Sequence, residues 1–322
     1  MGQDATDTRP SWMIWAALTT VYIVWGSTYL GIMVVMETIP PILGGAMRFI
    51  TAGLLLAGVL LIRHGPSVFA MTRRQFGGAA LVGVLLLTAG NGMIALAQQH
   101  ISTGMAALLV AVVPLFLVIL RVAARDRPNL LTLVGVLIGL GGVAVLSLVG
   151  DTGETGGTGI VIILLASVSW SIGSFMSARM AMPASPFAAS AVEMLVGGAA
   201  MAAVGLVTGE RLDVAAISPA SWTAMAYLIA VGSLLGYTSY VWLLKNAPIS
   251  LVATYAYVNP IVAVILGMLI LDERLTPEMI AGGLVILLGV VLVVSTERRG
   301  RRPAVEAPAA RGPELSSPRA SS

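Results

Sequence analysis

Ten apolar runs occupy most of this chain, and each is long enough to cross a lipid bilayer as a helix. The hydrocarbon core of a bilayer is about 30 Å thick, so a helix needs roughly 20 apolar residues to span it. The runs cover residues 12–35, 41–62, 76–97, 102–123, 129–149, 158–180, 186–207, 221–244, 249–271 and 277–296. Breakers such as Pro40-Pro41 and Arg127-Pro128-Asn129 separate them. The sequence therefore predicts an all-α membrane protein with ten transmembrane helices.

The composition excludes a soluble globular protein. Only 10% of the 322 residues are charged and 57% are hydrophobic, whereas a typical soluble domain has about 25% charged residues. The chain has no cysteine, and its two histidines, His64 and His100, lie far apart in sequence. These counts exclude a disulfide framework and a thiolate metal site. We predict no catalytic residues, no metal site and no cofactor.

The distribution of positive charge predicts how the chain is oriented in the membrane. If the N-terminus is cytoplasmic, the inner segments hold fifteen of the eighteen Lys and Arg residues, and the outer loops hold only Arg211 and Arg274. Cytoplasmic segments carry such an excess, so we predict that both termini are cytoplasmic. The same clustering accounts for the net charge of +3 without a nucleic-acid partner.

The two terminal segments differ from the apolar runs. The first ten residues contain Asp4 and Asp7 against a single Arg9, and no small-residue cleavage site follows the first apolar run, so that run is expected to remain a membrane span. Residues 297–322 are rich in Pro, Ala and Ser, and we predict a disordered cytoplasmic tail.

The chain repeats itself with an offset of 145 to 147 residues. The matched pairs are Trp25 and Trp170, Arg48 and Glu193, Pro114 and Pro260, Gly135 and Gly282, and Gly142 and Gly289. Each repeat therefore holds five spans, the first over 12–149 and the second over 158–296, with an outer loop at 150–157. Because five is odd, the second copy enters the membrane from the opposite side. Inverted repeats of this kind are typical of secondary transporters, whose substrate site lies between the halves.

Several stretches resemble the EamA-like branch of the drug/metabolite transporter (DMT) superfamily. They read "WGSTYLGIMVV", "AMRFITAGLLL", "VVPLFLVIL" and "LLKNAPISLVATYAYVNPIVAVILGMLILDERLTPEMIAGGLVILLGVVLVV". The resemblance covers roughly residues 12–296 and implies the family's fold of ten helices in two inverted five-helix repeats. It further implies a carrier in the bacterial inner membrane, often an exporter of amino acids, metabolites or drug-like compounds.

Two charged residues, Arg48 and Glu193, lie within apolar runs. An arginine at the centre of a membrane helix costs about 2.5–3.5 kcal/mol on insertion scales. Mostly small residues lie three and four positions away from each charge, which favours helix packing or a cavity lining over lipid. Three interpretations stay open: both contact substrate in the cavity, both lie near gates, or both are structural.

The two charged positions differ in how well they match the family. Family members typically carry Arg at the first position, whereas Glu193 stands where an uncharged polar residue is more usual. A proton-coupling carboxylate is therefore a hypothesis, with protons as the coupling ion. One cation and one anion suit a zwitterion such as an amino acid, but an amphipathic drug or another metabolite fits nearly as well.

Other polar and aromatic side chains at membrane depth are weaker candidates for substrate binding. They are Asn91, Trp25, Trp170, Tyr237, Tyr257 and Asn259, with Tyr255 on the same run. For each aromatic residue, plain packing is an equal alternative. Gly135, Gly139 and the pair Gly282-Gly283 indicate close helix packing, with a homodimer contact as the alternative.

Other classes of membrane protein fit less well. A channel needs a polar stripe along several spans or a ring of like charges. An enzyme or receptor is the remaining alternative, but no paired nucleophile and base lies within the spans. We predict a secondary active transporter that binds a small-molecule substrate and works by alternating access in the bilayer.

Overall fold

The computed structural model describes residues 11–125, 128–149 and 153–299. Some side chains within these ranges lie outside the description, namely those of residues 11, 146–149, 153–156, 249–250, 257 and 297–299. In the described part of the chain every regular element is helical. The predicted all-α architecture is therefore confirmed.

Six long elements are single helices. They are α1 (Ser11–Met36), α2 (Pro41–His64), α7 (Leu130–Val149), α8 (Gly153–Ser177), α9 (Pro186–Val207) and α14 (Pro277–Arg299). Four of them extend beyond the expected spans: α1 by one residue at each end, α2 by two residues at its end, α8 by five residues at its start and α14 by three residues at its end.

The other helical segments are divided. The first group is α3 (Arg73–Gly83), η2 (Val84–Asn91) and α4 (Gly92–Ala97), followed by α5 (Thr103–Val110) and α6 (Val113–Ala123). The second is α10 (Pro219–Tyr227), η4 (Leu228–Tyr237) and α11 (Thr238–Asn246), followed by α12 (Ile249–Val252) and α13 (Tyr255–Ile270). Short 3₁₀ turns, η1 (Pro66–Phe69) and η3 (Val214–Ala216), lie in two connections.

Eight helical segments are long and apolar enough to cross a membrane, by length and composition. Two expected spans fall short of that criterion, because their described apolar helices run only from Leu130 to Val145 and from Val258 to Ile270. In the second case the helix is interrupted between α12 and α13, which divides the expected span 249–271.

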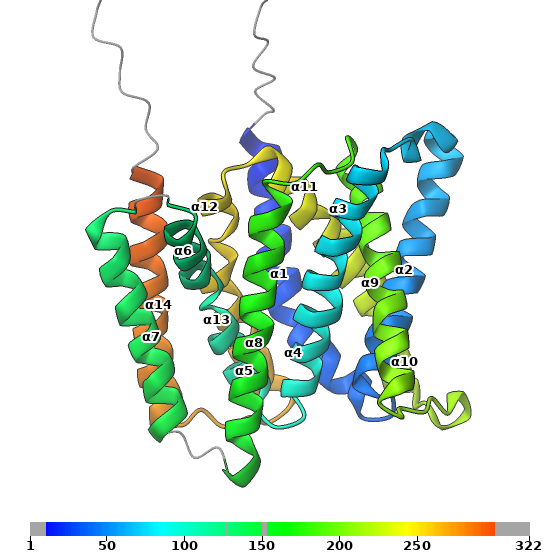
Figure 1. The fold of residues 1–322 in the computed structure, drawn as a ribbon. Coiled ribbons are helices and arrows are strands. Elements are labelled where there is room, and N and C mark those ends of the chain that lie inside the picture. Colours follow the sequence, from blue (N-terminus) through cyan, green and yellow to red (C-terminus); the bar gives the residue numbers. More distant parts are fainter. Residues whose placement is uncertain (1–10, 126–127, 150–152, 300–322) are drawn as a thin grey trace, which may run out of the picture.

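The helices form one bundle in which α1 begins and α14 ends at the same end (Figure 1). We call this the terminal end and the opposite one the far end. Helix α1 lies near the middle of the bundle, where it packs against α13, α10 and α11. Helices α7 and α14 pack side by side at one edge of the view in Figure 1.

Glycines allow α7 and α14 to approach closely. A Cβ at Gly289 would lie 2.4 Å from the backbone nitrogen of Gly139 and 2.6 Å from the carbonyl oxygen of Gly135. A Cβ at Gly142 would lie 2.7 Å from the Ile286 nitrogen. The predicted close packing is thus made within one chain by these glycines, and a homodimer contact stays a prediction.

Two segments, η2 and η4, are π-helical rather than α-helical. They end at Asn91 and Tyr237, 146 positions apart in the sequence. A π-helical turn misaligns one carbonyl with the normal hydrogen-bond pattern, and such turns are frequent at functional sites. Here Ser169 on α8 donates to the Leu85 carbonyl of η2 at 2.8 Å.

Candidate functional site: a central pocket and a terminal-end cavity

A small central pocket lies where α1, α2, η2, α8, η4 and α13 meet. Its volume is about 40 Å³, which is room for roughly three water molecules. Six of the eight predicted substrate-binding residues line it: Trp25, Arg48, Asn91, Trp170, Tyr237 and Asn259. This volume is smaller than that of an organic solute.

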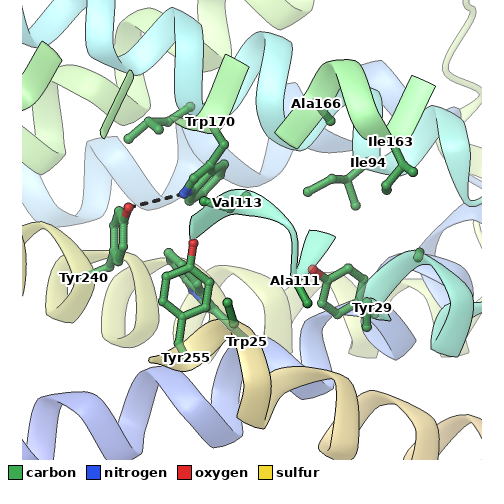
Figure 2. Close-up of a cluster of buried hydrophobic side chains, with 14 of the residues drawn as sticks. Trp25, Tyr29, Ile94, Ala111, Val113, Ile163, Ala166, Trp170, Tyr240 and Tyr255 are labelled. Carbon is green, nitrogen blue, oxygen red and sulfur yellow. Dashed lines mark hydrogen bonds between the residues drawn. The ribbon is translucent and has the colours of Figure 1, made fainter. Parts of the chain in front are cut away.

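Aromatic rings form one side of this pocket. Trp25 and Trp170, which occupy matching positions of the two repeats, meet edge to face with ring centres 5.4 Å apart and an interplanar angle of 87°. Figure 2 shows Tyr240 and Tyr255 beside them, with the Trp170 indole nitrogen donating to the Tyr240 hydroxyl at 3.3 Å. Edge-to-face packing is the preferred geometry of such rings. Their sequence positions do not reveal this contact.

Arg48 lies on α2 and reaches η4. Its side chain is 4% exposed, its Nε donates to Ser233 Oγ at 2.8 Å, and its Cζ lies 4.7 Å from the centre of the Phe49 ring. The absence of a side chain at Gly232 makes room for the guanidinium, because a Cβ there would lie 2.8 Å from one terminal nitrogen.

Glu193 lies on α9 and does not line the central pocket. Its Oε2 accepts a hydrogen bond of 2.7 Å from the hydroxyl of Tyr237, which does line that pocket. Glu193 lines instead a second cavity of about 370 Å³, together with Met182, Pro186 and Lys245. We call this the terminal-end cavity, because the α8–α9 turn and the end of α11 lie at the terminal end (Figure 1).

The remaining predicted residues lie in different surroundings. Asn91 is half-buried at the end of η2. Asn259 is 4% exposed, and with its amide nitrogen facing α1 it donates to the Tyr22 carbonyl at 2.9 Å. Asn259 therefore links α13 to α1 as well as lining the pocket. Tyr257 belongs to α13, but its side chain lies outside the described residues.

Sequence reasoning missed three residues of this region: Tyr29, Ser233 and Tyr240. Tyr29 lines the central pocket, and Tyr240 also accepts or donates a 2.8 Å hydrogen bond with Ser174. Ser233 and Tyr240 lie four positions before and three positions after Tyr237, a spacing that places them near one another on a helix face. From that spacing Ser233 and Tyr240 could have been predicted as neighbours of Tyr237.

The described residues hold no group of three His, Cys, Asp or Glu side chains that could bind a metal ion. The two cavities instead offer two cations, Arg48 and Lys245, together with a carboxylate, hydroxyls and aromatic faces. Such a set binds and orients a small organic molecule.

Comparison with known proteins identifies the family. The family model described as "EamA-like transporter family" matches the chain twice, over residues 10–148 and 157–295. A protein named "Uncharacterized inner membrane transporter YedA" from Escherichia coli K12 is 38% identical over 282 residues, which cover 87% of this chain and 90% of that protein. "Protein PecM" from Dickeya dadantii is 25% identical over 290 residues, which cover 88% and 93%.

The fold also has a counterpart among solved structures. A crystal structure of a protein that is 18% identical to this chain superposes with a TM-score of 0.65, covering 91% of this chain and all of that one. That similarity concerns the fold alone. The family match over both halves and the 38% identical relative show that the chain is a multi-pass inner-membrane protein that belongs to the EamA-like transporter family.

Proposed function

We propose that this protein is a secondary active transporter that exports small organic solutes across the bacterial inner membrane by alternating access. Its ten transmembrane helices form two inverted five-helix repeats, 12–149 and 158–296. The connection at residues 150–157, of which 153–157 belong to α8, lies on the outer side. Segments 1–11 and 297–322, of which 1–10 and 300–322 lie outside the described residues, are cytoplasmic. The contact between Trp25 and Trp170 carries the proposal, because matching positions of the two halves meet at a pocket in the bundle centre.

Further pairs of features support the inverted repeats. The family model matches the chain once in each half, and both halves contain a π-helical segment at corresponding positions. The left-handed residues also form pairs, since Gly65 corresponds to Gly209 and Arg125 to Asp272, 144 and 147 positions apart. Two copies of one unit can exchange conformations at nearly equal energy, which is what alternating access requires.

The terminal-end cavity provides a route by which a solute could enter from the cytoplasm, as export requires. Positive charge gathers at the ends of helices on the terminal side, in Arg63, Arg121, Arg179 and Lys245, which favours a cytoplasmic location for that end. The cavity of about 370 Å³ would then face the cytoplasm and admit solute from inside the cell. Export follows if the central pocket later opens at the far end.

Glu193 supports coupling to protons. It lies at the boundary between the two cavities, is 1% exposed, and is bonded to Tyr237 on the pocket side. The charged and titratable groups around it are Tyr237, Tyr240 and, across the cavity, Lys245. A carboxylate in this position can take up a proton from the terminal-end cavity and thereby change its hydrogen bond with Tyr237 on the side of the central pocket.

The test is flux of labelled amino acids and organic acids into proteoliposomes, with and without a pH gradient. We expect Arg48→Ala to lower flux about tenfold or more, as for the loss of a charged hydrogen-bond partner. Glu193→Gln should transport at a rate that no longer responds to the gradient. Glu37→Gln, an exposed change at the far end, is the control.

Each outcome addresses one part of the proposal. Wild-type flux in both variants would remove Arg48 and Glu193 from the site. A wild-type rate that ignores pH gradients would exclude proton coupling, and single-channel currents would show a channel instead of a carrier.

A further inference from the structure

Arg48 presents an incompletely bonded cation to the central pocket. Among its nitrogens only Nε has a hydrogen bond to a described residue, and that partner, Ser233, is neutral. No carboxylate of the described residues forms an ion pair with the guanidinium. Because a buried charge without a counter-ion is costly, this pocket favours a ligand that supplies negative charge.

The second intramembrane charge does not supply it. Glu193 lies beyond Tyr237 and lines the terminal-end cavity rather than the central pocket. Among the described lining residues of the central pocket, Arg48 alone carries a charge. A zwitterion held between Arg48 and Glu193 is therefore not the ligand that this arrangement favours.

We propose that the solute is an organic oxyanion whose charged group binds the terminal nitrogens of Arg48 and whose flat apolar part packs on Trp25, Trp170 and Tyr255. This inference rests on the proposed transport function. A guanidinium binds carboxylate or phosphate through two parallel hydrogen bonds. Aromatic faces bury the apolar body of the ligand and orient it.

The experiment compares phenylacetate with its neutral counterpart phenylacetamide, and adds phenyl phosphate to separate carboxylate from phosphate. Binding to the purified full-length protein is measured by tryptophan fluorescence and thermal stabilisation. We expect phenylacetate or phenyl phosphate to bind about tenfold more tightly than phenylacetamide. Arg48→Gln should remove this preference, and Arg48→Lys should retain part of it.

Arg179→Gln is the matched control. Arg179 also lies over a phenylalanine, with its Cζ 3.6 Å from the Phe175 ring centre, but it is exposed and does not line the pocket. Equal binding of phenylacetamide and both anions, no binding of either anion, or an unchanged preference in Arg48→Gln would overturn the inference. Flux of neutral or cationic solutes alone would also overturn it while leaving the transport function intact.

A second inference comes from the far end of the bundle, where two glutamates bind the N-termini of helices. Glu210 follows α9, and its carboxylate accepts hydrogen bonds from the backbone nitrogens of Ile42 (3.1 Å) and Leu43 (2.7 Å) at the start of α2. Its own backbone N–H donates to the Gly205 carbonyl at 2.9 Å. The preceding Gly209 has a φ of 84°, which reverses the chain over the helix end.

Glu273 repeats this arrangement after α13. Its carboxylate accepts from the nitrogens of Thr103 (2.7 Å) and Gly104 (3.1 Å) at the start of α5. Its backbone N–H donates to the Gly267 carbonyl at 3.1 Å, and the preceding Asp272 has a φ of 52°. We call Glu210 and Glu273 with their bonded nitrogens the two carboxylate clasps. Each joins a helix of the second half to a helix of the first.

One of the two corresponding positions at the terminal end is different. The residue that follows Gly65, the counterpart of Gly209, is Pro66, which has no carboxylate. The counterpart of Glu273 is Asp126, which lies outside the described residues. The start of α9, the counterpart of α2, is capped by its own Ser185. The far end is therefore held by the two clasps, whereas the terminal end contains the 370 Å³ cavity.

We infer that the two carboxylate clasps hold the far end closed and must both open before the central pocket can be reached from that side. A carboxylate at a helix N-terminus is stabilised by the unpaired backbone N–H groups and by the helix dipole. Because the clasps join different helix pairs, each contributes separately to the closed state.

Cysteine labelling tests this inference, because the natural chain contains no cysteine. Val110→Cys places one thiol in the lining of the central pocket, and a membrane-impermeant thiol reagent is applied from the far side. We expect labelling to be about threefold faster in Glu210→Gln or Glu273→Gln and about tenfold faster in the double variant. Glu37→Gln, with the same loss of charge at the same end, should label at the parent rate.

A purely structural role for the clasps predicts a lower melting temperature without faster labelling. Parent-rate labelling of the folded double variant from the far side would therefore overturn the inference. So would an equal acceleration in Glu37→Gln, which would assign the effect to surface charge. The assay needs no knowledge of the solute, so its result is independent of the oxyanion proposal.

Discussion

Gly232 shows how one residue controls the position of the buried cation. At this position of η4 a Cβ would lie 2.8 Å from a terminal nitrogen of Arg48 and 3.1 Å from Thr28 Cγ2. The guanidinium is the far end of a flexible side chain, so it can move aside without unfolding the helix. The consequence of a methyl group here is therefore expected in ligand binding rather than in stability.

We predict that Gly232→Ala leaves the protein folded but weakens binding of the oxyanion probe about tenfold, because the displaced guanidinium loses its hydrogen-bond geometry. The measurement is the dissociation constant for phenylacetate or phenyl phosphate, with the melting temperature as a check of folding. Gly58→Ala on α2 is the control, since a Cβ there meets no atom within 4 Å. Unchanged affinity in Gly232→Ala would contradict the placement of the anion.

At the scale of elements, the π-helical segments distinguish this bundle from a set of regular spans. Both lie beside the buried charges: η4 contributes Ser233 and Tyr237 to Arg48 and Glu193. A Cβ at Gly83, the last residue before η2, would lie 2.5 Å from the Glu193 carbonyl oxygen. A backbone carbonyl in a π-helical turn can be bonded by a donor on another helix, as the Leu85 carbonyl is by the Ser169 hydroxyl.

Ser169→Ala should destabilise the protein by about 1 kcal/mol, because the half-buried Leu85 carbonyl loses its donor on α8. Ser167→Ala on the same helix is the comparison, since Ser167 donates to Ile163 within α8 at 2.9 Å and its loss should cost less. Melting temperatures of the two purified variants measure the difference. Equal melting temperatures would show that the η2 carbonyl does not depend on Ser169.

The seam between α7 and α14 allows a second prediction at this scale. Gly289→Ala should destabilise the protein by about 1–3 kcal/mol, because the new methyl group meets backbone atoms that cannot move aside. Gly141→Ala on α7, where no atom lies within 4 Å, should be neutral or slightly stabilising. Thermal unfolding of both variants in detergent measures the effect, and a neutral Gly289→Ala would contradict the close packing.

At the scale of the whole molecule, the bundle is asymmetric although its two halves are related in sequence. Two carboxylate clasps hold the far end, and a cavity opens at the terminal end. The pocket between them is too small for a solute in this conformation. A further apolar pocket of about 700 Å³ lies between α1, α10 and α13, lined by Val34, Pro219 and Leu266 among others.

Reporter fusions at the two termini test the proposed orientation. Because α1 begins and α14 ends at the same end of the bundle (Figure 1), reporters at both termini should be active in the cytoplasm and inactive outside it. Termini found on opposite sides of the membrane would contradict both the ten-span proposal and the inverted repeats.

The helical architecture, the membrane environment and the family could all be predicted from the amino-acid sequence. Apolar runs of about twenty residues leave few alternatives, since only helices or closed barrels satisfy the backbone in lipid. The 145-residue offset paired Trp25 with Trp170, and the structure brings these two residues into contact. Membership of the EamA-like family, inferred from short motifs, was confirmed by the family match over both halves.

The partners of the polar groups, by contrast, follow from how the helices pack. The tertiary structure separates Arg48 and Glu193 into different cavities, with Tyr237 between them. It also brings the carboxylates of Glu210 and Glu273 to the N-termini of helices that lie more than 160 residues earlier in the sequence. Periodicity places a side chain on a helix face, but its partner depends on helix rotation and on shifts such as the π-helical turns. Those are fixed only when all helices pack together.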